Sequence, residues 1–358
     1  MYQQYFGLVE APFSIAVNPR YLFMSARHRD ALAHLLYGVG SGGGFIMLTG
    51  EVGTGKTTLN RCLLHQLPPN TDIAIVLNPA LNARPEPVLE EWLERITSEL
   101  AAYDEANPDA PSAPFAVNQI VHGSNARLKH DMDMCVKYKV PIVITSLGAK
   151  EWVNEMVHSY GGIVLHDVIN NRFANKAIEK GADGLIAVAA GAGGHAGTTS
   201  PMALIQEIRE WFDGPLLLSG SIATGDAVLA AQAMGADLAY IGSAFIATEE
   251  ADAEQAYKQA IVDYGADDIV YSNLFTGVHG NYLKPSIEAA GLDPTNLPES
   301  DPSKMDFGSG GNTDAKAWKS IWGCGQGIGA VKELGTASDY VTKLTDQYHQ
   351  AKQRINSL

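Results

Sequence analysis

The chain has 358 residues, of which 46% are hydrophobic, and is long enough for one large α/β barrel or two modest domains with full cores. Its net charge of −15 argues against a nucleic-acid partner, because such binding depends on clustered lysine and arginine that this chain does not concentrate. The three cysteines, Cys62, Cys135 and Cys324, are far apart and form no C-x-x-C pair, so we expect neither a disulfide framework nor a metal site.

The first residues lack the basic region and the uninterrupted apolar stretch of a signal peptide, and no later segment reaches the roughly 18 apolar residues of a membrane span. We therefore expect a cytoplasmic protein without a membrane partner. The acidic composition favours a small-molecule substrate, and the sequence leaves a homo-oligomer open.

The first motif along the chain is a glycine-rich loop in the segment LTGEVGTGKTTLNRCLL, residues 48–64. Gly50, Gly55, Lys56 and Thr57 fit the pattern G-x-x-x-x-G-K-[ST]. In this pattern backbone amides wrap phosphate oxygens, the lysine neutralises them and the threonine hydroxyl meets magnesium. Taken alone, the loop predicts that ATP and magnesium bind here.

Eight short apolar runs, separated by stretches with helical periodicity, indicate repeated β-α units on a parallel sheet. They span residues 45–50, 73–78, 115–121, 141–146, 162–167, 184–190, 215–221 and 238–244. Eight such units predict a (β/α)8 barrel of the TIM type, an α/β fold whose catalytic groups lie on the loops after the strands. A doubly wound open sheet is the alternative.

The segment from about residue 271 is rich in Gly, Pro, Asp and Asn, and the chain then closes with a predicted helix at residues 337–358. This composition indicates an appended cap rather than an independent domain.

A glycine-rich segment, AAGAGGHAGTTSP at residues 189–201, follows the predicted strand 184–190. Its exposed backbone amides surround one imidazole, that of His195, at the catalytic end of a strand. Histidine is the side chain whose unperturbed pKa lies closest to neutrality, so His195 is a candidate general base. The alternative is a flexible loop with an incidental surface histidine.

Small residues also follow the seventh and eighth predicted strands. They are Ser219, Gly220 and Ser221 in LSGSIATG, and Gly242 and Ser243 in IGSAF. Many barrels hold a phosphate between these two loops, so the residues predict a phosphate site. The alternative is that the glycines only permit tight turns.

Residues 1 to about 81 resemble the N-terminal part of the general secretion pathway ATPases of the ExeA type. The resemblance is carried by YFGL, PFSI, NPRYLF, ARHRDALAHLLYGV, FIMLTGEVGTGKTTLNRCLL and LNP. Such an ATPase also needs an acidic residue that ends a later apolar strand, and elements that sense the γ-phosphate. The sequence contains no recognisable form of these, so we expect anion binding at this loop without ATP hydrolysis.

From about residue 82 onward, the chain resembles the nitronate monooxygenases, which are FMN-dependent barrels. The resemblance is carried by LNARPEPVLEEWL, FAVNQIVHGSNARL, VPIVITSLG, HSYGGIVLHDV, KGADGLIAVAAGAGGHAG, DGPLLLSGSIATG, MGADLAYIGSAFIATEEA and WGCGQGIG. It implies FMN as the cofactor and dioxygen as a second substrate. The implied reaction oxidises alkyl nitronates or nitroalkanes to a carbonyl compound and nitrite.

The resemblance also implies roles for individual residues. His195 would take a proton from the carbon next to the nitro group, and Asn118 matches a position near the flavin ring. Gly193 and Gly194 would let the flavin approach the backbone, while the two serine-glycine loops would hold its phosphate. We interpret three other polar residues at strand ends as structural, namely His122, His166 and Asp167.

The two resemblances meet at residues 77–85, so the chain has the form of a fusion. The first strand, flavin loop and second strand of the monooxygenase family are not recognisable, and the ATPase fragment supplies a strand, a helix and a strand in their place. We therefore predict a P-loop fragment at 1–81 that contributes two barrel strands, an FMN-binding barrel at 82–270 and a C-terminal cap at 271–358. Closure of the barrel is a hypothesis.

Three alternative functions stay open at this point. The first is an ATP-binding module of a secretion ATPase without the complete hydrolysis machinery. The second is another flavin barrel, such as an enoyl reductase. The third is a composite chain that folds and has no catalytic activity.

Overall fold

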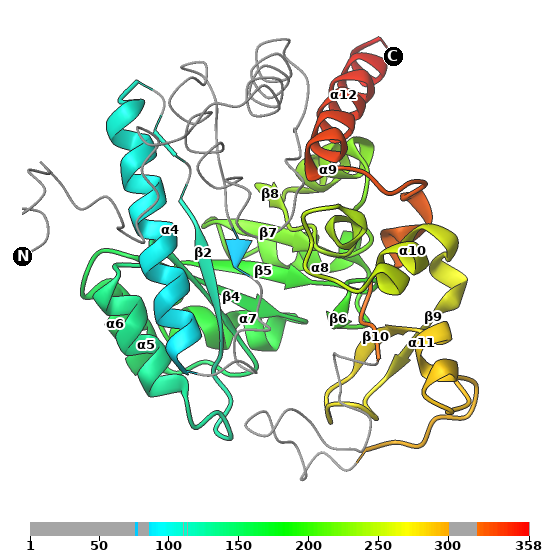
Figure 1. Ribbon diagram of the computed structural model, residues 1–358, viewed down its shortest axis with the longest axis horizontal. Coiled ribbons are helices and arrows are strands. Elements are labelled where there is room, and N and C mark those ends of the chain that lie inside the picture. Colours follow the sequence, from blue (N-terminus) through cyan, green and yellow to red (C-terminus); the bar gives the residue numbers. More distant parts are fainter. Residues whose placement is uncertain (1–75, 78–85, 110, 113, 301–320, 358) are drawn as a thin grey trace, which may run out of the picture.

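The computed structural model describes residues 76–77, 86–109, 111–112, 114–300 and 321–357 (Figure 1). The glycine-rich loop with Gly50, Gly55, Lys56 and Thr57 lies outside the described residues, as does the predicted strand at 45–50. The expectations for those segments therefore stay predictions.

The described residues contain a sheet of seven parallel strands in the order β1-β2-β3-β4-β5-β7-β8. The strands are β1 (Val76–Leu77), β2 (Ala116–Ile120), β3 (Ile142–Ser146), β4 (Ile163–Val168), β5 (Gly184–Val188), β7 (Leu216–Ser219) and β8 (Leu238–Ala239). Each overlaps one of the last seven apolar runs of the sequence, so the prediction of a parallel α/β fold is confirmed.

The strand order distinguishes the two predicted architectures. Every pair of neighbours is parallel, and the strands follow one another along the sheet in chain order. A doubly wound sheet reverses its order at a switch point, whereas a barrel places successive strands side by side. The order is that of a (β/α) barrel. Within the described residues no pairing joins β8 to β1, so closure of the barrel stays a prediction.

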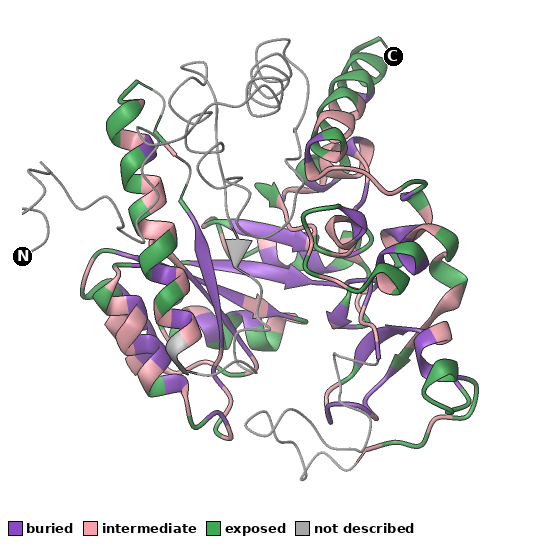
Figure 2. Cartoon of the chain, viewed as in Figure 1, coloured by how far each residue is buried: buried purple, intermediate pink, exposed green. Residues whose placement is uncertain are grey.

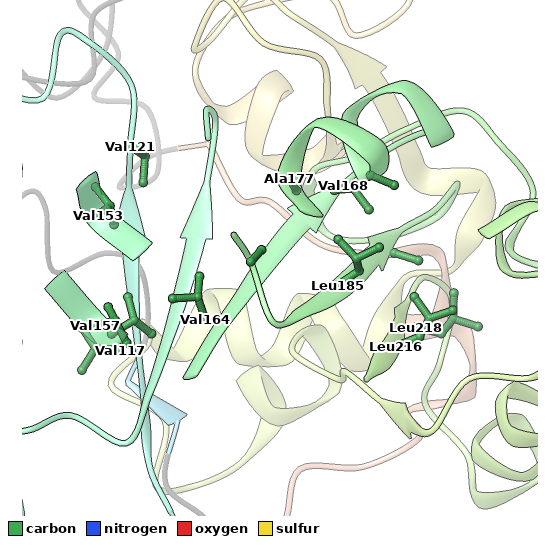
Figure 3. Close-up of a cluster of buried hydrophobic side chains, with 14 of the residues drawn as sticks. Val117, Val121, Val153, Val157, Val164, Val168, Ala177, Leu185, Leu216 and Leu218 are labelled. Atoms are coloured by element: carbon green, nitrogen blue, oxygen red, sulfur yellow. The ribbon is translucent and has the colours of Figure 1, made fainter. Parts of the chain in front are cut away.

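Helices follow the strands and cover one face of the sheet (Figure 1). They are α4 (Glu86–Ala106), α5 (Leu128–Lys137), α6 (Glu151–His158), α7 (Asn171–Glu179), α8 (Pro201–Arg209) and α9 (Gly225–Met234). Strand residues such as Val117, Val164 and Leu185 pack with helix residues such as Val153 and Ala177 in one buried cluster (Figure 3). Of the strands, β2, β3, β5 and β7 are mostly buried (Figure 2), as expected of the centre of a parallel sheet.

The opposite, inner face of the sheet has its own apolar cluster. Ala116, Ile144, Leu165, Ile186 and Leu217 alternate in sequence with the helix-facing residues and form this second cluster. Side chains of a strand point to alternate faces, so residues two positions further along each strand also lie on the inner face. By this register the inner face carries polar side chains at the carboxyl ends of the strands.

A second, three-stranded sheet was not predicted from the sequence. It has the order β6-β10-β9, with β6 (Gly194–His195), β9 (Ile269–Ser272) and β10 (Gly280–Leu283) all antiparallel. β10 comes from the segment predicted as a cap, and it pairs directly with the glycine-rich loop. The predicted boundary at residue 270 falls within β9, and the division into domains stays a proposal.

The remaining described elements complete the C-terminal part. They are η3 (Ser243–Ala247), α10 (Gln255–Asp263), η4 (Ala266–Asp268), α11 (Lys284–Ala289), η6 (Gln326–Ala330) and α12 (Ala337–Asn356). The helix predicted at 337–358 is confirmed as α12, which packs against α9. A Cβ atom on Gly225 would lie 2.0 Å from the carbonyl oxygen of Leu344, so glycine is needed for this approach.

Within the ranges that the structure describes, no helix is both long enough and apolar enough to cross a membrane.

Candidate active site

His195 is the second residue of the short strand β6, and the small antiparallel sheet fixes its backbone. Its backbone partner across the ladder is Gly280 of β10. Its Nε2 atom lies 2.8 Å from the hydroxyl oxygen of Thr276, in the turn between β9 and β10. Thr276 is 81 residues further along the chain and is buried. The structure thus orients the predicted base with a residue that sequence reasoning did not identify.

The hydrogen bonds of Thr276 determine which nitrogen of His195 is basic. The Thr276 hydroxyl lies 3.0 Å from the carbonyl oxygen of Val278, to which it donates its proton. A hydroxyl has one proton, so in its contact with Nε2 the Thr276 oxygen accepts. We therefore assign the proton of neutral His195 to Nε2, which leaves Nδ1 as the nitrogen with the basic lone pair.

Burial lowers the pKa of His195 to about 4, against 6.5 for an ordinary histidine. At neutral pH the imidazole is therefore uncharged and able to accept a proton. This protonation state is the one that a general base requires.

The glycine-rich loop packs against the loop after β8 and against the C-terminal segment WGCGQGIG. A Cβ atom on Gly193 would lie 2.5 Å from the hydroxyl oxygen of Ser243 and 2.8 Å from the amide nitrogen of Gly325. The same Ser243 oxygen accepts a hydrogen bond from the Gly325 amide at 2.8 Å. Three segments far apart in the sequence therefore meet at Gly193, where no larger residue would fit.

The loop after β7 approaches the same glycine-rich segment. The amide of Ser221 donates to the carbonyl oxygen of Gly191 at 3.2 Å, and Gly220 has a φ of +149°. Ser221 itself has a φ of +57°, a left-handed conformation that is uncommon for residues other than glycine and costs on the order of 1 kcal/mol. Such a conformation occurs at ligand-binding loops, where the surrounding structure enforces it.

The two predicted phosphate loops fit an anion. Within the described residues, the amides of Gly220, Gly242 and Ser243 donate no hydrogen bond to protein atoms. Gly242 is exposed, and a Cβ built on it would have nothing within 4 Å. Free amides beside open space at the ends of β7 and β8 are the chemistry that holds a phosphate group. Ser219, at the end of β7, and Ser221, in the loop after it, add hydroxyl groups to the first of these loops.

Asn118 belongs to a separate polar chain across the ends of β2, β3 and β4, all on the inner face of the sheet. Its Nδ2 atom donates to the hydroxyl of Ser146 at 3.2 Å, and this hydroxyl donates to Oδ2 of Asp167 at 2.6 Å. The register places Ser146 beside Asp167, whereas Asn118 lies two residues earlier, level with Ile144 and Leu165. We call Asn118, Ser146 and Asp167 the inner polar strip.

Asp167, which we interpreted from the sequence as structural, has one carboxyl oxygen with a partner and one without. Its Oδ1 atom is buried and has no hydrogen-bond partner in the described part of the chain. Burial raises the pKa of Asp167 to about 6, while the bond from Ser146 lowers it. A buried oxygen without a partner is costly, so it marks a place where a ligand can supply the missing contact.

The other two strand-end histidines have local protein partners. His166 lies on the helix-facing side of β4, where its Nδ1 bonds the hydroxyl of Thr145, and burial lowers its pKa to about 4. The Nδ1 atom of His122 lies 2.9 Å from the hydroxyl oxygen of Ser124. These contacts support the structural interpretation of both residues.

The structure brings the predicted residues together in two groups at the carboxyl edge of the parallel sheet. The loops that carry Gly193, Ser221 and Ser243 contact one another, and Gly194 and His195 continue from them into β6. Asn118 lies on the inner polar strip, and no described hydrogen bond joins the strip to His195. The segment after His195 nevertheless passes close to the end of β4. A Cβ built on Gly197 would lie only 2.9 Å from the Cβ of Ile169, which follows β4.

Two family models match the chain. The model described as nitronate monooxygenase matches residues 96–347, and the model described as AAA ATPase domain matches residues 21–137. The overlap of the two matches contains β2 and α5, which the structure places within the parallel sheet and its helical layer.

Two relatives correspond to the two parts of the chain. General secretion pathway protein A of Aeromonas hydrophila is 67% identical over 84 residues, which cover 24% of this chain and 15% of that protein. A probable nitronate monooxygenase of Staphylococcus haemolyticus (strain JCSC1435) is 24% identical over 277 residues, which cover 72% of this chain and 73% of that protein. The chain thus spans only a small part of the secretion protein's length.

The fold is also that of a solved structure. The nitroalkane oxidase from Streptomyces ansochromogenes aligns with a TM-score of 0.62 and 20% identity, over 80% of this chain and 90% of that one. At this level of identity the likeness concerns the fold alone.

Proposed function

Because this chain belongs to the nitronate monooxygenase family, we propose that it is an FMN-dependent oxidoreductase that oxidises alkyl nitronates or nitroalkanes with O2. The products would be a carbonyl compound and nitrite. The observation that carries the proposal is the setting of His195, a neutral imidazole held by Thr276 at the carboxyl edge of a barrel-type sheet. This arrangement supports proton abstraction next to a nitro group.

His195 would act as the general base toward a neutral nitroalkane. Its Nδ1 atom would take the proton from the carbon that carries the nitro group, while its Nε2 proton remains bonded to Thr276. The charged imidazolium formed in this step would keep that hydrogen bond, because Nε2 is a donor in both states. A substrate supplied as the nitronate has already lost this proton and would not need the base.

The loops after β7 and β8 would hold the FMN phosphate. The amides of Gly220, Gly242 and Ser243 and the hydroxyls of Ser219 and Ser221 provide the donors. Gly193 and Gly194 would let the ring approach the backbone, and the amide of Asn118 would contact the ring from the inner polar strip. When bound, FMN would supply the redox chemistry, in which it takes electrons from the nitronate and passes them to O2.

Nitrite release separates the role of His195 from a general effect on the fold. We expect His195→Asn to lose at least about 100-fold in kcat with a neutral nitroalkane and less than about tenfold with the matching nitronate. His349→Asn, on the exposed side of α12, is the matched control and should leave both rates unchanged. Equal losses with both substrates would contradict the base role, and a wild-type protein that takes up no FMN would contradict the cofactor.

A second candidate function is nucleotide binding by the N-terminal segment. It is favoured by the match of residues 21–137 to the AAA ATPase domain and by the 67% identity to a secretion pathway protein. The residues involved would be Gly50, Gly55, Lys56 and Thr57, which hold phosphate and magnesium in such loops.

An ATP titration in the presence of magnesium tests this second function. Binding should disappear in Lys56→Ala, because the lysine neutralises the phosphate charge. Lys129→Ala, an exposed residue of α5, is a control for the lost charge. An unchanged titration with Lys56→Ala would dismiss the site.

A further inference from the structure

The inner polar strip ends in a carboxyl group that the proposed base chemistry does not use. Asp167 lies at the carboxyl end of β4, and Ser146 donates a hydrogen bond to its Oδ2 atom at 2.6 Å. Its Oδ1 atom is buried and has no partner within the described chain. A structural aspartate would normally satisfy both oxygens, because a buried polar atom without a hydrogen bond costs on the order of 1 to 3 kcal/mol.

Burial extends the pH range in which Asp167 is neutral up to about pH 6. No lysine or arginine forms an ion pair with it among the described residues. Burial raises its pKa to about 6. The Tyr240 phenol, which follows β8, is the titratable group that faces it, and burial together with the Asp167 charge raises the pKa of Tyr240 further above its usual range. His166, next in the chain, points to Thr145 on the other face.

Asp167 lies on the inner face of the sheet, because it is two positions beyond Leu165, which belongs to the inner apolar cluster. Tyr240, which follows β8, packs against the same cluster. The Asp167 side chain therefore faces away from the helical layer, on the side of the sheet where Tyr240 also packs.

We propose that Asp167 is a cofactor-binding residue, which at mildly acidic pH stands as a neutral acid and donates a hydrogen bond from Oδ1 to a carbonyl oxygen of the flavin ring. The inference rests on the proposed function, since it needs a flavin at this edge of the sheet. Asn118 and Asp167 lie on the inner face of the sheet and are linked through the hydroxyl of Ser146, so one planar ring can meet both. A neutral donor suits this ring, whereas a carboxylate would face its carbonyl oxygens with like charge.

A fluorescence titration of FMN into the full chain at pH 5, where Asp167 is mostly protonated, tests the proposal with two variants. Asp167→Ala removes the donor and should weaken FMN binding about tenfold, the equivalent of one hydrogen bond of about 1.4 kcal/mol. Asp167→Asn keeps a donor of nearly the same shape and should bind FMN within about threefold of wild type. Asp213→Asn, which removes an exposed carboxylate, is the control and should change nothing.

The absorption spectrum of bound FMN gives a second readout that a merely structural role would not affect. In the wild type it should shift between pH 5 and pH 8 as Asp167 ionises beside the ring, and in Asp167→Asn it should stay constant. This readout also decides the question if Asp167→Ala fails to fold. Two results would overturn this inference alone. The first is that both variants bind FMN with wild-type affinity and still show the pH-dependent spectral shift. The second is that Asp167→Asn binds FMN as weakly as Asp167→Ala. Absence of FMN binding by the wild type would overturn the proposed function, and this inference with it.

Discussion

The Nε2 atom of His195 donates a hydrogen bond to the hydroxyl of Thr276 at 2.8 Å, across 81 residues of sequence. The Thr276 hydroxyl donates a hydrogen bond to the carbonyl oxygen of Val278, which leaves its oxygen to accept the one from the imidazole. One buried threonine thereby sets both the direction of the ring and the nitrogen that carries the lone pair. The proposed base depends on this residue, although Thr276 itself does not touch the substrate.

Replacing Thr276 with valine keeps the volume and removes the acceptor. We expect kcat with a neutral nitroalkane to fall about tenfold and KM to change little, because a lost hydrogen bond of about 1.4 kcal/mol releases the orientation of His195. Thr276→Ser restores the hydroxyl and should recover most of the rate. The prediction fails if Thr276→Val turns over nitroalkane as fast as the wild type.

The pH dependence of kcat/KM reports the base of the free enzyme. Burial lowers the pKa of His195 to about 4, and the base is active when unprotonated. With a neutral nitroalkane, kcat/KM should therefore stay level as pH falls from 8 to about 5 and decline only toward pH 4. A decline centred near pH 6.5 would indicate an exposed histidine and would contradict the geometry.

Gly193 lies where three segments meet, and a substitution can test whether this position requires a residue without a side chain. In Gly193→Ala the new Cβ would lie 2.5 Å from the Ser243 oxygen and 2.8 Å from the Gly325 nitrogen, so both loops must move. We expect FMN affinity to fall by tenfold or more in a fluorescence titration. Gly265→Ala, whose Cβ would meet no atom within 4 Å, is the matched control and should bind FMN as the wild type does.

Gly225 provides a corresponding test of the fold. A Cβ there would lie 2.0 Å from the Leu344 carbonyl oxygen and 2.3 Å from the Tyr348 amide nitrogen, both backbone atoms of α12 that no rotamer change can move. Gly225→Ala should separate α9 from α12 and cost about 1 to 3 kcal/mol of unfolding free energy, measured by urea denaturation. An unchanged denaturation midpoint would show that the two helices are not packed this closely.

The parallel strands could be predicted because the central ones are buried and apolar. Gly184–Val188, for example, is a continuous apolar run that is buried throughout, and such runs followed by helical periodicity indicate β-α units without knowledge of tertiary contacts. The phosphate site at the loops after β7 and β8 stays a prediction, which rests on the place of these loops after the last two strands.

The small antiparallel sheet could not be predicted in the same way. β6 consists of only two residues, Gly194 and His195, and its pairing partner Gly280 lies far along the chain in a segment that reads as a polar cap. Thr276 was missed because nothing near it in sequence signals contact with a histidine. Asp167 was visible at a strand end, but its unpartnered oxygen results from the packing of three strands, which no local pattern encodes.

The stability of the cofactor-free protein should reveal the ionisation state of Asp167. Its pKa is about 6 in the folded chain and 3.8 as an ordinary carboxyl, so the folded state binds more protons between these values. The stability that Asp167 contributes is fully present below pH 3.8 and is lost as pH rises through 6. This loss amounts to about 3 kcal/mol for a shift of this size, at about 1.4 kcal/mol per pKa unit.

Asp167→Asn cannot ionise and should escape this loss. Relative to the wild type, we expect the variant to gain unfolding free energy when the pH is raised from 4.5 to 8, as measured by urea denaturation without FMN. His166, whose pKa burial lowers to about 4, has the opposite sign: the protein is destabilised as pH falls from 6.5 toward 4. That contribution is common to both proteins and cancels in the difference. A difference between variant and wild type that is constant across this pH range would mean that Asp167 does not change its ionisation there, and would argue against a neutral acid in the site.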